Sequence, residues 1–98
     1  MSSEQVAIVI PALNEEEAIR HLLPEIPPYT ATWIIVADNG STDNTAEVAH
    51  SLGALVSSEP IRGYGRNCLA GFKMARTLGA DIVVFLEGMC TVPSSSAE

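Results

Sequence analysis

The sequence predicts an α/β protein in which helices cover both faces of a parallel sheet. Short apolar runs alternate along the chain with segments of helical pattern, in the order β-α-β-α-β-α-β. Three of the four runs are rich in Val and Ile and do not alternate with polar residues, which is typical of strands buried on both faces. Right-handed crossovers between such strands give a doubly wound sheet. The expected strands are Val6–Ile10, Trp33–Ala37, Ala54–Val56 and Ile82–Leu86.

Three helices are expected between these strands. Asn14 and Glu17 have the spacing of a capping box, which predicts that the first helix begins at Asn14. The second and third helices are expected over residues 44–52 and 65–78, and a glycine follows each of them as a C-cap. The expected apolar stripes consist of Ala18, Ile19, Leu22 and Leu23, then Thr45, Ala49 and Leu52, then Cys68, Leu69, Phe72 and Ala75.

Length, charge and cysteine content limit the classes of function. The 98 residues form one domain, expected over residues 1–93 with a polar tail at 94–98. Five Lys and Arg stand against twelve Asp and Glu, so no basic face is available for nucleic acid or an anionic membrane. Cys68 and Cys90 lie in no CxxC motif and have no histidine nearby, so a zinc site is not expected. The apolar runs are too short for a membrane span and the first residues do not form a signal peptide, which predicts a cytoplasmic protein.

Polar residues follow the first two strands, at the edge where open α/β sheets hold ligands. Asp38 and Asn39 end the second strand, and a carboxylate there can accept hydrogen bonds from a nucleotide base or a ribose. Glu15 follows Pro11 at the mouth of the first loop and is a candidate for ligand contact. The alternatives remain open: an ordinary turn for Asp38–Asn39, and helix capping for the residues around Glu15.

Two further segments carry candidate ligand-binding groups. Arg62 and Gly65 precede the third helix, where a guanidinium, backbone amides and a helix N-terminus can hold a diphosphate. The segment fits the dinucleotide fingerprint poorly because Cys68 occupies the position of the third glycine, and a flexible loop is the alternative. Glu87 follows the fourth strand and can reach a metal or a sugar hydroxyl, but one carboxylate with Met89 makes a weak site for Mg²⁺ or Mn²⁺.

Taken together, these segments resemble the nucleotide-binding half of a family 2 glycosyltransferase of the GT-A fold, in the branch of dolichyl-phosphate mannose synthase. Ile-Pro-Ala-Leu-Asn-Glu-Glu resembles the opening motif of the family, and Ala-Asp-Asn-Gly-Ser-Thr-Asp-Asn-Thr resembles its DDGSTDxT motif, with Asn39 at the second Asp. Arg-Gly-Tyr-Gly-Arg-Asn resembles the GxGxAxxxG segment, and Asp-Ile-Val-Val-Phe-Leu-Glu resembles the strand that leads into the metal-binding DxD. The four motifs occur in order and cover nearly the whole chain.

The resemblance implies a fold and a set of roles. The fold is a Rossmann-like sheet of four strands in the order 3-2-1-4, a truncated form of the nucleotide-diphospho-sugar transferase fold. Pro11, Glu15 and Asp38 lie around the base and ribose, with Asn39 beside them. The diphosphate is approached by Arg62 and Gly65. The first Asp of the DxD corresponds to Glu87 and the second to Met89, so a divalent ion (Mg²⁺ or Mn²⁺) loses one ligand.

The expected function is transfer of a sugar from a donor of the GDP-mannose or UDP-glucose class to a polyprenyl phosphate or a glycan. No residue is identified as the catalytic base, and the acceptor half of the family follows the point where this sequence stops, so the chain alone is expected to be inactive. The alternative is a non-catalytic remnant or an oligomeric nucleotide-binding domain. The free edge of the fourth strand predicts a homo-oligomer. A flavodoxin-like or receiver domain fits less well, because Ser57 stands where a receiver needs its phosphorylatable Asp.

Overall fold

The structure is a computed structural model that describes residues 4–86. It contains one parallel sheet with the strand order β3-β2-β1-β4, which confirms the predicted order 3-2-1-4. The predicted strands are all present, with ends that differ by one or two residues. Their bounds are Val6–Ala12 for β1, Trp33–Asp38 for β2, Leu55–Ser58 for β3 and Ile82–Phe85 for β4.

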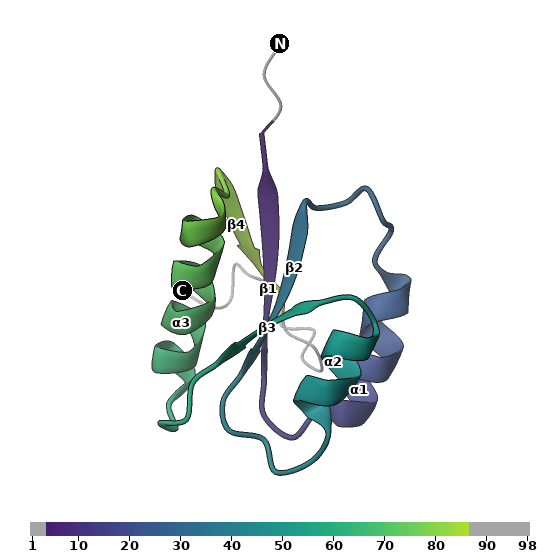
Figure 1. The fold of residues 1–98 in the computed structure, drawn as a ribbon, viewed down its shortest axis with the longest axis vertical. Helices are drawn as coiled ribbons and strands as arrows, with labels where there is room; N and C mark the ends of the chain where they lie inside the picture. Colours follow the sequence, from purple (N-terminus) through teal and green to yellow (C-terminus); the bar gives the residue numbers. More distant parts are fainter. Residues whose placement is uncertain (1–3, 87–98) are drawn as a thin grey trace, which may run out of the picture.

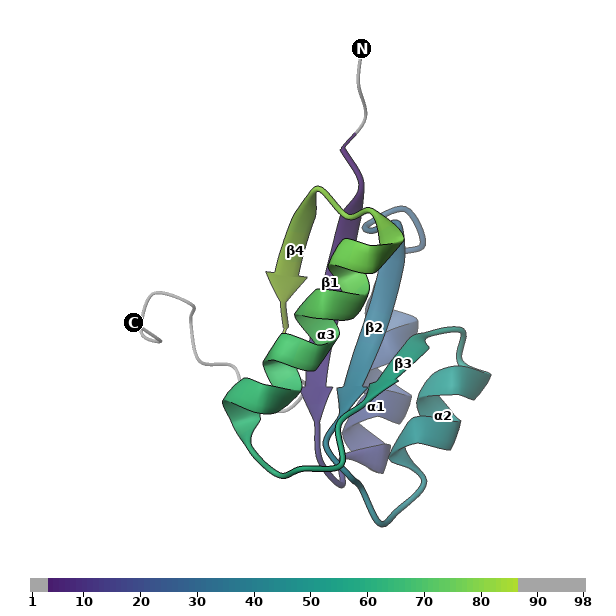
Figure 2. The same cartoon turned by 60° about the vertical axis from the view of Figure 1, so that its left-hand side comes forward.

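Helices cover both faces of the sheet, as the sequence predicts. Figure 1 shows α1 and α2 on one side of the strands and α3 on the other, and the turned view in Figure 2 shows α3 lying across the face of β1 and β2. None of the helices in the described part of the chain is long and apolar enough to cross a membrane. The bounds are Glu16–Leu22 for α1, Leu23–Glu25 for the 3-10 turn η1, Thr45–Ser51 for α2 and Tyr64–Leu78 for α3.

The core has two layers because successive residues of a strand point to opposite faces. Ile8 and Ile10 of β1 pack with Ile19 of α1 and Ala49 of α2. On the other face Ala7 and Val9 of β1 pack with Ile35 and Ala37 of β2 and with Ala75 of α3. The central strands β1 and β2 are therefore buried on both faces, as their unbroken apolar character predicts.

Some details of the predicted helices are wrong. Asn14 does not cap α1: the N-cap position belongs to Glu15, and no side chain caps it. Leu52 and Leu69 were expected in apolar stripes but are exposed. Ala75 of the predicted stripe is buried, and the other buried residues of α3 are Asn67 and Gly71, which the stripe did not include.

Pro11 lies inside β1, which has a neighbouring strand on each side. A proline has no N–H to donate, so a central strand accepts it only where no partner needs that donor. The carbonyl of Val9 accepts a hydrogen bond from the Leu86 amide at 2.9 Å, and Pro11, two residues on, turns its backbone to the same side. The described pairing of β1 with β4 ends at Val9 and Phe85, so Pro11 interrupts no described hydrogen bond.

Gly71 allows α3 to approach the sheet closely. A Cβ atom at this position would lie 2.5 Å from Cγ1 of Val9 and 3.3 Å from Cβ of Ala37, so a side chain would force the helix away from β1 and β2. At Gly65, near the start of the same helix, a Cβ atom would meet no heavy atom within 4 Å.

We predict that Gly71→Ala destabilises the fold by about 1–3 kcal/mol, the usual cost of overpacking a core, despite the higher helix propensity of alanine. Urea unfolding followed by circular dichroism measures the change. Gly65→Ala is the matched control, and its free energy of unfolding should equal or exceed that of the parent chain. Equal stability of the two variants would show that α3 does not need this close approach.

The exposed strand β4 is the other feature of the fold with a measurable consequence. Its residues Ile82, Val84 and Phe85 are 40%, 43% and 42% exposed, whereas β1 and β2 are buried. Within the described residues β4 pairs only with β1, so one side of its backbone has no strand beside it. Self-association through this edge remains a prediction from the sequence, and the exposed apolar side chains support it.

We predict that a second copy pairs along β4, so light scattering at tens of micromolar should give a mass above that of one chain. Val84→Lys, which places a charge on the exposed strand, should return the mass to that of a monomer. Thr77→Lys, on the exposed surface of α3, is the control and should leave the oligomer intact. A parent chain that is monomeric throughout this range would contradict the prediction.

Candidate functional site

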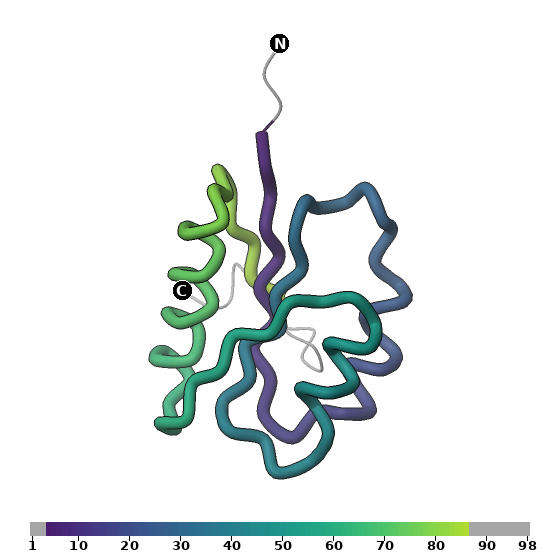
Figure 3. Tube along the Cα trace, in the orientation of Figure 1, coloured from purple at the N-terminus to yellow at the C-terminus, as the bar shows by residue number. Residues whose placement is uncertain are grey.

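Three loops meet at one end of the sheet, because parallel strands place their carboxyl ends together. The trace in Figure 3 shows the loops after β1, β2 and β3 at the end of the molecule opposite the N-terminus. They comprise residues 13–15, 39–44 and 59–63, and together they are called the rim below. Ligands of open α/β sheets bind at this edge.

Asn14 joins the first loop of the rim to the second. Its side-chain oxygen Oδ1 accepts hydrogen bonds from the amides of Thr42, at 2.8 Å, and Asp43, at 3.3 Å. Its own amide donates to Oγ of Ser41 at 2.8 Å. Asn14 has a φ of 53°, a left-handed conformation that asparagine tolerates better than most residues. The residue predicted to cap a helix therefore connects two loops instead.

Asp43 makes a second connection between these loops. Its Oδ1 atom accepts a hydrogen bond from the Thr45 amide at 2.9 Å and another from the Thr45 hydroxyl, while Oδ2 accepts from the Glu16 amide at 3.3 Å. The amide of Glu15 donates in turn to the Thr45 hydroxyl oxygen at 3.0 Å. The hydrogen bond from the Thr45 side chain, supported by those from backbone amides, lowers the pKa of Asp43 below 3.8. Asp43 was not among the predicted site residues, although it is the second acid of the Asp-Asn-Gly-Ser-Thr-Asp motif.

Asp38 ends β2 and is 7% exposed. Its Oδ1 atom accepts hydrogen bonds from both the amide and the hydroxyl of Ser41. The Ser41 hydroxyl thus donates to Asp38 and accepts from the Asn14 amide, which links the end of β2 to the loop after β1. These bonds hold the Asp38 side chain in one orientation at the end of β2, next to the rim.

Asn39, the next predicted site residue, turns toward the third loop. Its Nδ2 group donates to the carbonyls of Glu59, at 2.7 Å, and Ile61, at 2.9 Å. Its Oδ1 atom accepts from the Gly63 amide at 3.0 Å. The residue is only 4% exposed, so these bonds lie inside the protein. Asn39 connects β2 to the loop that leads into α3.

The other predicted residues lie at the same end of the sheet. Pro11 is buried near the end of β1 and Glu15 is partly buried just before α1. Arg62 is exposed in the third loop, and Gly65 is the second residue of α3. Asn67 lies two residues further along this helix, where its Nδ2 group donates to the Ala37 carbonyl at 2.8 Å and fixes the start of α3 to the end of β2.

The predicted metal ligand is Glu87, in the segment that follows β4. Glu87 and Met89 lie outside the described residues, as does Cys90. Within residues 4–86, no group of three or more His, Cys, Asp or Glu side chains is arranged to hold a metal ion. The donor set within residues 4–86 therefore does not fit a divalent ion.

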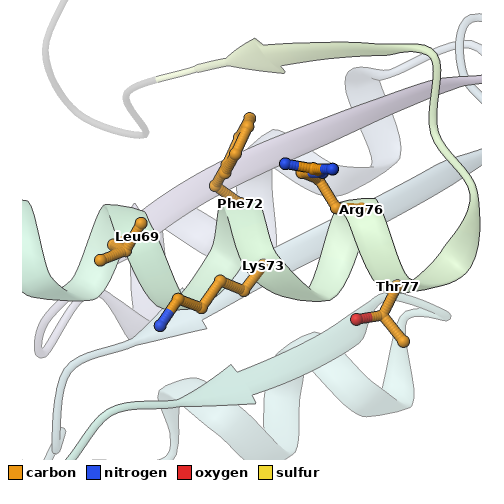
Figure 4. Close-up of a pocket in the computed structure, with 5 residues that line it drawn as sticks. All are labelled: Leu69, Phe72, Lys73, Arg76 and Thr77. Atoms are coloured by element: carbon orange, nitrogen blue, oxygen red, sulfur yellow. The ribbon is translucent and has the colours of Figure 1, made fainter.

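The described residues line at least two surface hollows. One, of about 490 Å³, lies at the rim and is lined by residues 13–18 and Asp43. The other, of about 570 Å³, runs along the outer surface of α3, and Figure 4 shows that all five lining side chains project from this helix. The second hollow includes none of the predicted site residues, so the rim is the candidate site. The five residues are Leu69, Phe72, Lys73, Arg76 and Thr77.

The lowered pKa of Asp43 predicts a pH dependence of stability. A carboxyl group with a lowered pKa in the folded state contributes stability above its unfolded-state pKa and loses it as the pH falls through the folded-state pKa. Asp43→Asn should therefore unfold more easily than the parent chain at neutral pH. This difference should shrink as the pH falls below 3.8, the ordinary pKa of an aspartate, and disappear in stronger acid.

Urea unfolding of both chains across this pH range measures the difference. Glu25→Gln, at an exposed carboxylate in η1, is the control and should change stability less at neutral pH. A difference between Asp43→Asn and the parent chain that does not vary with pH would contradict the role given to the Asp43 carboxylate.

Comparison with known proteins identifies the family. Residues 7–93 match the model of glycosyl transferase family 2. Protein RfbJ of Shigella flexneri is 38% identical over 96 residues, which is 97% of this chain and 72% of RfbJ. An uncharacterised glycosyltransferase of Mycobacterium tuberculosis is 46% identical over 78 residues, which is 79% of this chain and 34% of that protein.

Solved structures agree with this match. Glucosyl-3-phosphoglycerate synthase of Mycobacterium tuberculosis in complex with UDP is similar with a TM-score of 0.75 and 34% identity, over 93% of this chain and 36% of the synthase. The same enzyme with Mn²⁺, UDP-glucose and phosphoglyceric acid gives a TM-score of 0.73 and 35% identity, over 88% of this chain and 33% of the synthase. The chain thus spans about a third of these solved relatives. The resemblance found in the four motifs is confirmed: the chain belongs to glycosyl transferase family 2.

Proposed function

We propose that the rim binds the nucleoside diphosphate of a nucleotide-sugar donor, and that this chain supplies the donor-binding part of a glycosyltransferase. The observation that carries the proposal is the convergence of three hydrogen-bonded loops at the carboxyl ends of β1, β2 and β3. The likeness to a synthase solved with UDP, at 34% identity, supports the same assignment.

Under this proposal Asp38, Glu15 and Pro11 surround the base and ribose. One oxygen of Asp38 is occupied by Ser41, which leaves the second carboxylate oxygen to accept a hydrogen bond from a ribose hydroxyl or a base N–H. The ring of Pro11 fixes its φ angle, so the backbone near the end of β1 is rigid. Because Asp38 is already held by Ser41, little entropy is lost when a ligand binds to it.

The diphosphate would lie against Arg62 and the N-terminus of α3. The helix has 15 residues, and its first amides and dipole favour an anion at this end. A Cβ atom at Gly65 would enter open space, so the glycine leaves room for a ligand beside these amides. The chain carries a net charge of −7, and Arg62 and Arg66 place positive charge where the anion needs it.

The proposed donor is a UDP-sugar, with the GDP-mannose class as the alternative drawn from the resemblance. Support for UDP comes from the synthase, which was solved with UDP-glucose. The described residues bind and orient the nucleotide in this scheme, and the proposed acceptor remains a polyprenyl phosphate or a glycan. A cytoplasmic location also remains a prediction.

A second candidate is a nucleotide-binding domain that transfers no sugar. The sequence favours it at one position, because Met89 stands where the DxD motif has its second carboxylate. A thioether is a poor ligand for Mg²⁺ or Mn²⁺. Met89→Asp separates the candidates: gain of a metal-dependent increase in nucleotide affinity favours the donor site, and no gain favours the domain without transfer.

Calorimetric titration with uridine, UDP, UDP-glucose, GDP and GDP-mannose, with and without Mn²⁺, tests the proposal. We predict micromolar binding of UDP and UDP-glucose. Arg62→Gln should lower the UDP affinity about tenfold, the usual value of a charge-assisted hydrogen bond, and leave uridine affinity unchanged.

Lys73→Gln is the matched control, because it removes a cation from the outer surface of α3, away from the rim. Its UDP affinity should equal that of the parent chain. The absence of binding by every nucleotide, on folded protein, would contradict the proposal. Equal losses of UDP affinity in the Arg62 and Lys73 variants would show that the loss comes from the change in net charge and not from a contact with Arg62.

A further inference from the structure

Asn39 stands at a motif position predicted to bind the nucleotide, but its side chain bonds to backbone groups of the loop after β3. These three hydrogen bonds form a clamp between the end of β2 and residues 59–63. Both hydrogens of its Nδ2 group point to carbonyl oxygens, those of Glu59 and Ile61, at 2.7 and 2.9 Å. Its Oδ1 atom accepts from the Gly63 amide at 3.0 Å. Asn39 is 4% exposed, and its two N–H donors and its oxygen acceptor are already used within the protein.

The orientation of this amide follows from the chemistry of its partners. Carbonyl oxygens only accept hydrogen bonds, and the Gly63 N–H only donates one, so turning the amide over would place like groups against each other at all three contacts. An aspartate at this position would face the two carbonyls with a carboxylate oxygen and could keep only the bond from Gly63. The clamp therefore requires asparagine rather than a polar residue in general.

The clamped segment contains the groups proposed to hold the diphosphate. Arg62 lies between Ile61 and Gly63, two residues whose backbones Asn39 holds. Gly63 is also the N-cap residue of α3, so its position sets where the first amides of the helix lie. The neighbouring Gly40 packs against the same loop: a Cβ atom there would lie 3.6 Å from the Pro60 carbonyl oxygen.

We propose that Asn39 is a positioning residue for the diphosphate subsite, which acts by holding residues 59–63 to the end of β2 and does not touch the nucleotide. This inference rests on the proposed function of the rim. It assigns Asn39 a different role from Asp38 beside it, whose second carboxylate oxygen faces the base or ribose under that function. Two adjacent residues of one motif then serve two different parts of the ligand through different contacts.

The test compares Asn39→Asp with the parent chain by two measurements. The first is the amide hydrogen exchange of Gly63, followed by NMR without any ligand, which should become at least tenfold faster in the variant as the clamp opens. The second is the ratio of UDP affinity to uridine affinity, from calorimetry. This ratio should fall about tenfold, with uridine affinity unchanged, because only the diphosphate subsite is disturbed.

Gln5→Glu is the matched control. It makes the same change from an amide to a carboxylate and adds the same charge, at an exposed residue just before β1 and therefore at the end of the sheet opposite the rim. It should alter neither measurement. Asn39→Ser, which is neutral and too short to span the contacts, should reproduce the effect of Asn39→Asp and so exclude charge as its cause.

The outcomes separate this inference from the proposed function. Equal losses of uridine and UDP affinity in Asn39→Asp would overturn the inference by showing direct contact with the nucleoside. Unchanged exchange at Gly63 would overturn it by showing that the clamp does not hold the loop. If the parent chain binds neither ligand, the proposed function fails, and with it the role in a diphosphate subsite, while faster exchange at Gly63 would still show that Asn39 holds the loop.

Discussion

The register between β1 and β2 is the constraint on which the rest of the molecule depends. Pairing runs in step from Ala7 with Trp33 to Ala12 with Asp38, so both strands end at the same level. A shift of one residue would turn every buried side chain of one strand to the wrong face. It would also separate Asn14 from the amides of Thr42 and Asp43, to which it bonds. Core packing and the geometry of the rim are therefore set by the same alignment.

The sequence predicts the fold well because its strongest pattern, the apolar runs of the strands, is also what determines how the sheet packs. Unbroken runs of Val and Ile can be satisfied only by burial on both faces, and β1 and β2 are buried in that way. Strand β4 carries the same signal but is exposed, since within the described residues it lies at the edge of the sheet. The amino-acid composition of a strand shows how much burial it is suited to, but the elements packed beside it determine how much of it is buried.

The details of the rim could not be predicted in the same way. Asn14 with Glu17 reads as a capping box, yet the side chain of Asn14 bonds to a loop 28 and 29 residues away. Spacing along the chain carries information about local contacts only, and an asparagine offers the same groups to a distant amide as to a near one. The roles of Asn39 and Asn67 depend likewise on which carbonyl the fold brings within reach, at Glu59 and Ile61 for one and at Ala37 for the other.

A site that is assembled by hydrogen bonds before a ligand arrives explains how an acidic chain can be suited to an anionic ligand. Most of the acidic groups at the rim are engaged with backbone amides or hydroxyls, as Asp38 is with Ser41 and Asp43 with Thr45. Their partners orient them, and under the proposed function the N-terminus of α3 and Arg62 would receive the diphosphate. The structure thus separates carboxylates that build the site from the groups that would meet the phosphates.

The most direct test of this account is an NMR titration of the labelled chain with UDP, which reports the position of the ligand residue by residue. The account predicts that the largest changes in amide shift fall at residues 13–16, 38–42 and 61–66, and that the outer surface of α3 around Leu69 and Lys73 does not respond. Changes concentrated on that surface, or none at concentrations well into the millimolar range, would contradict a nucleotide site at the rim.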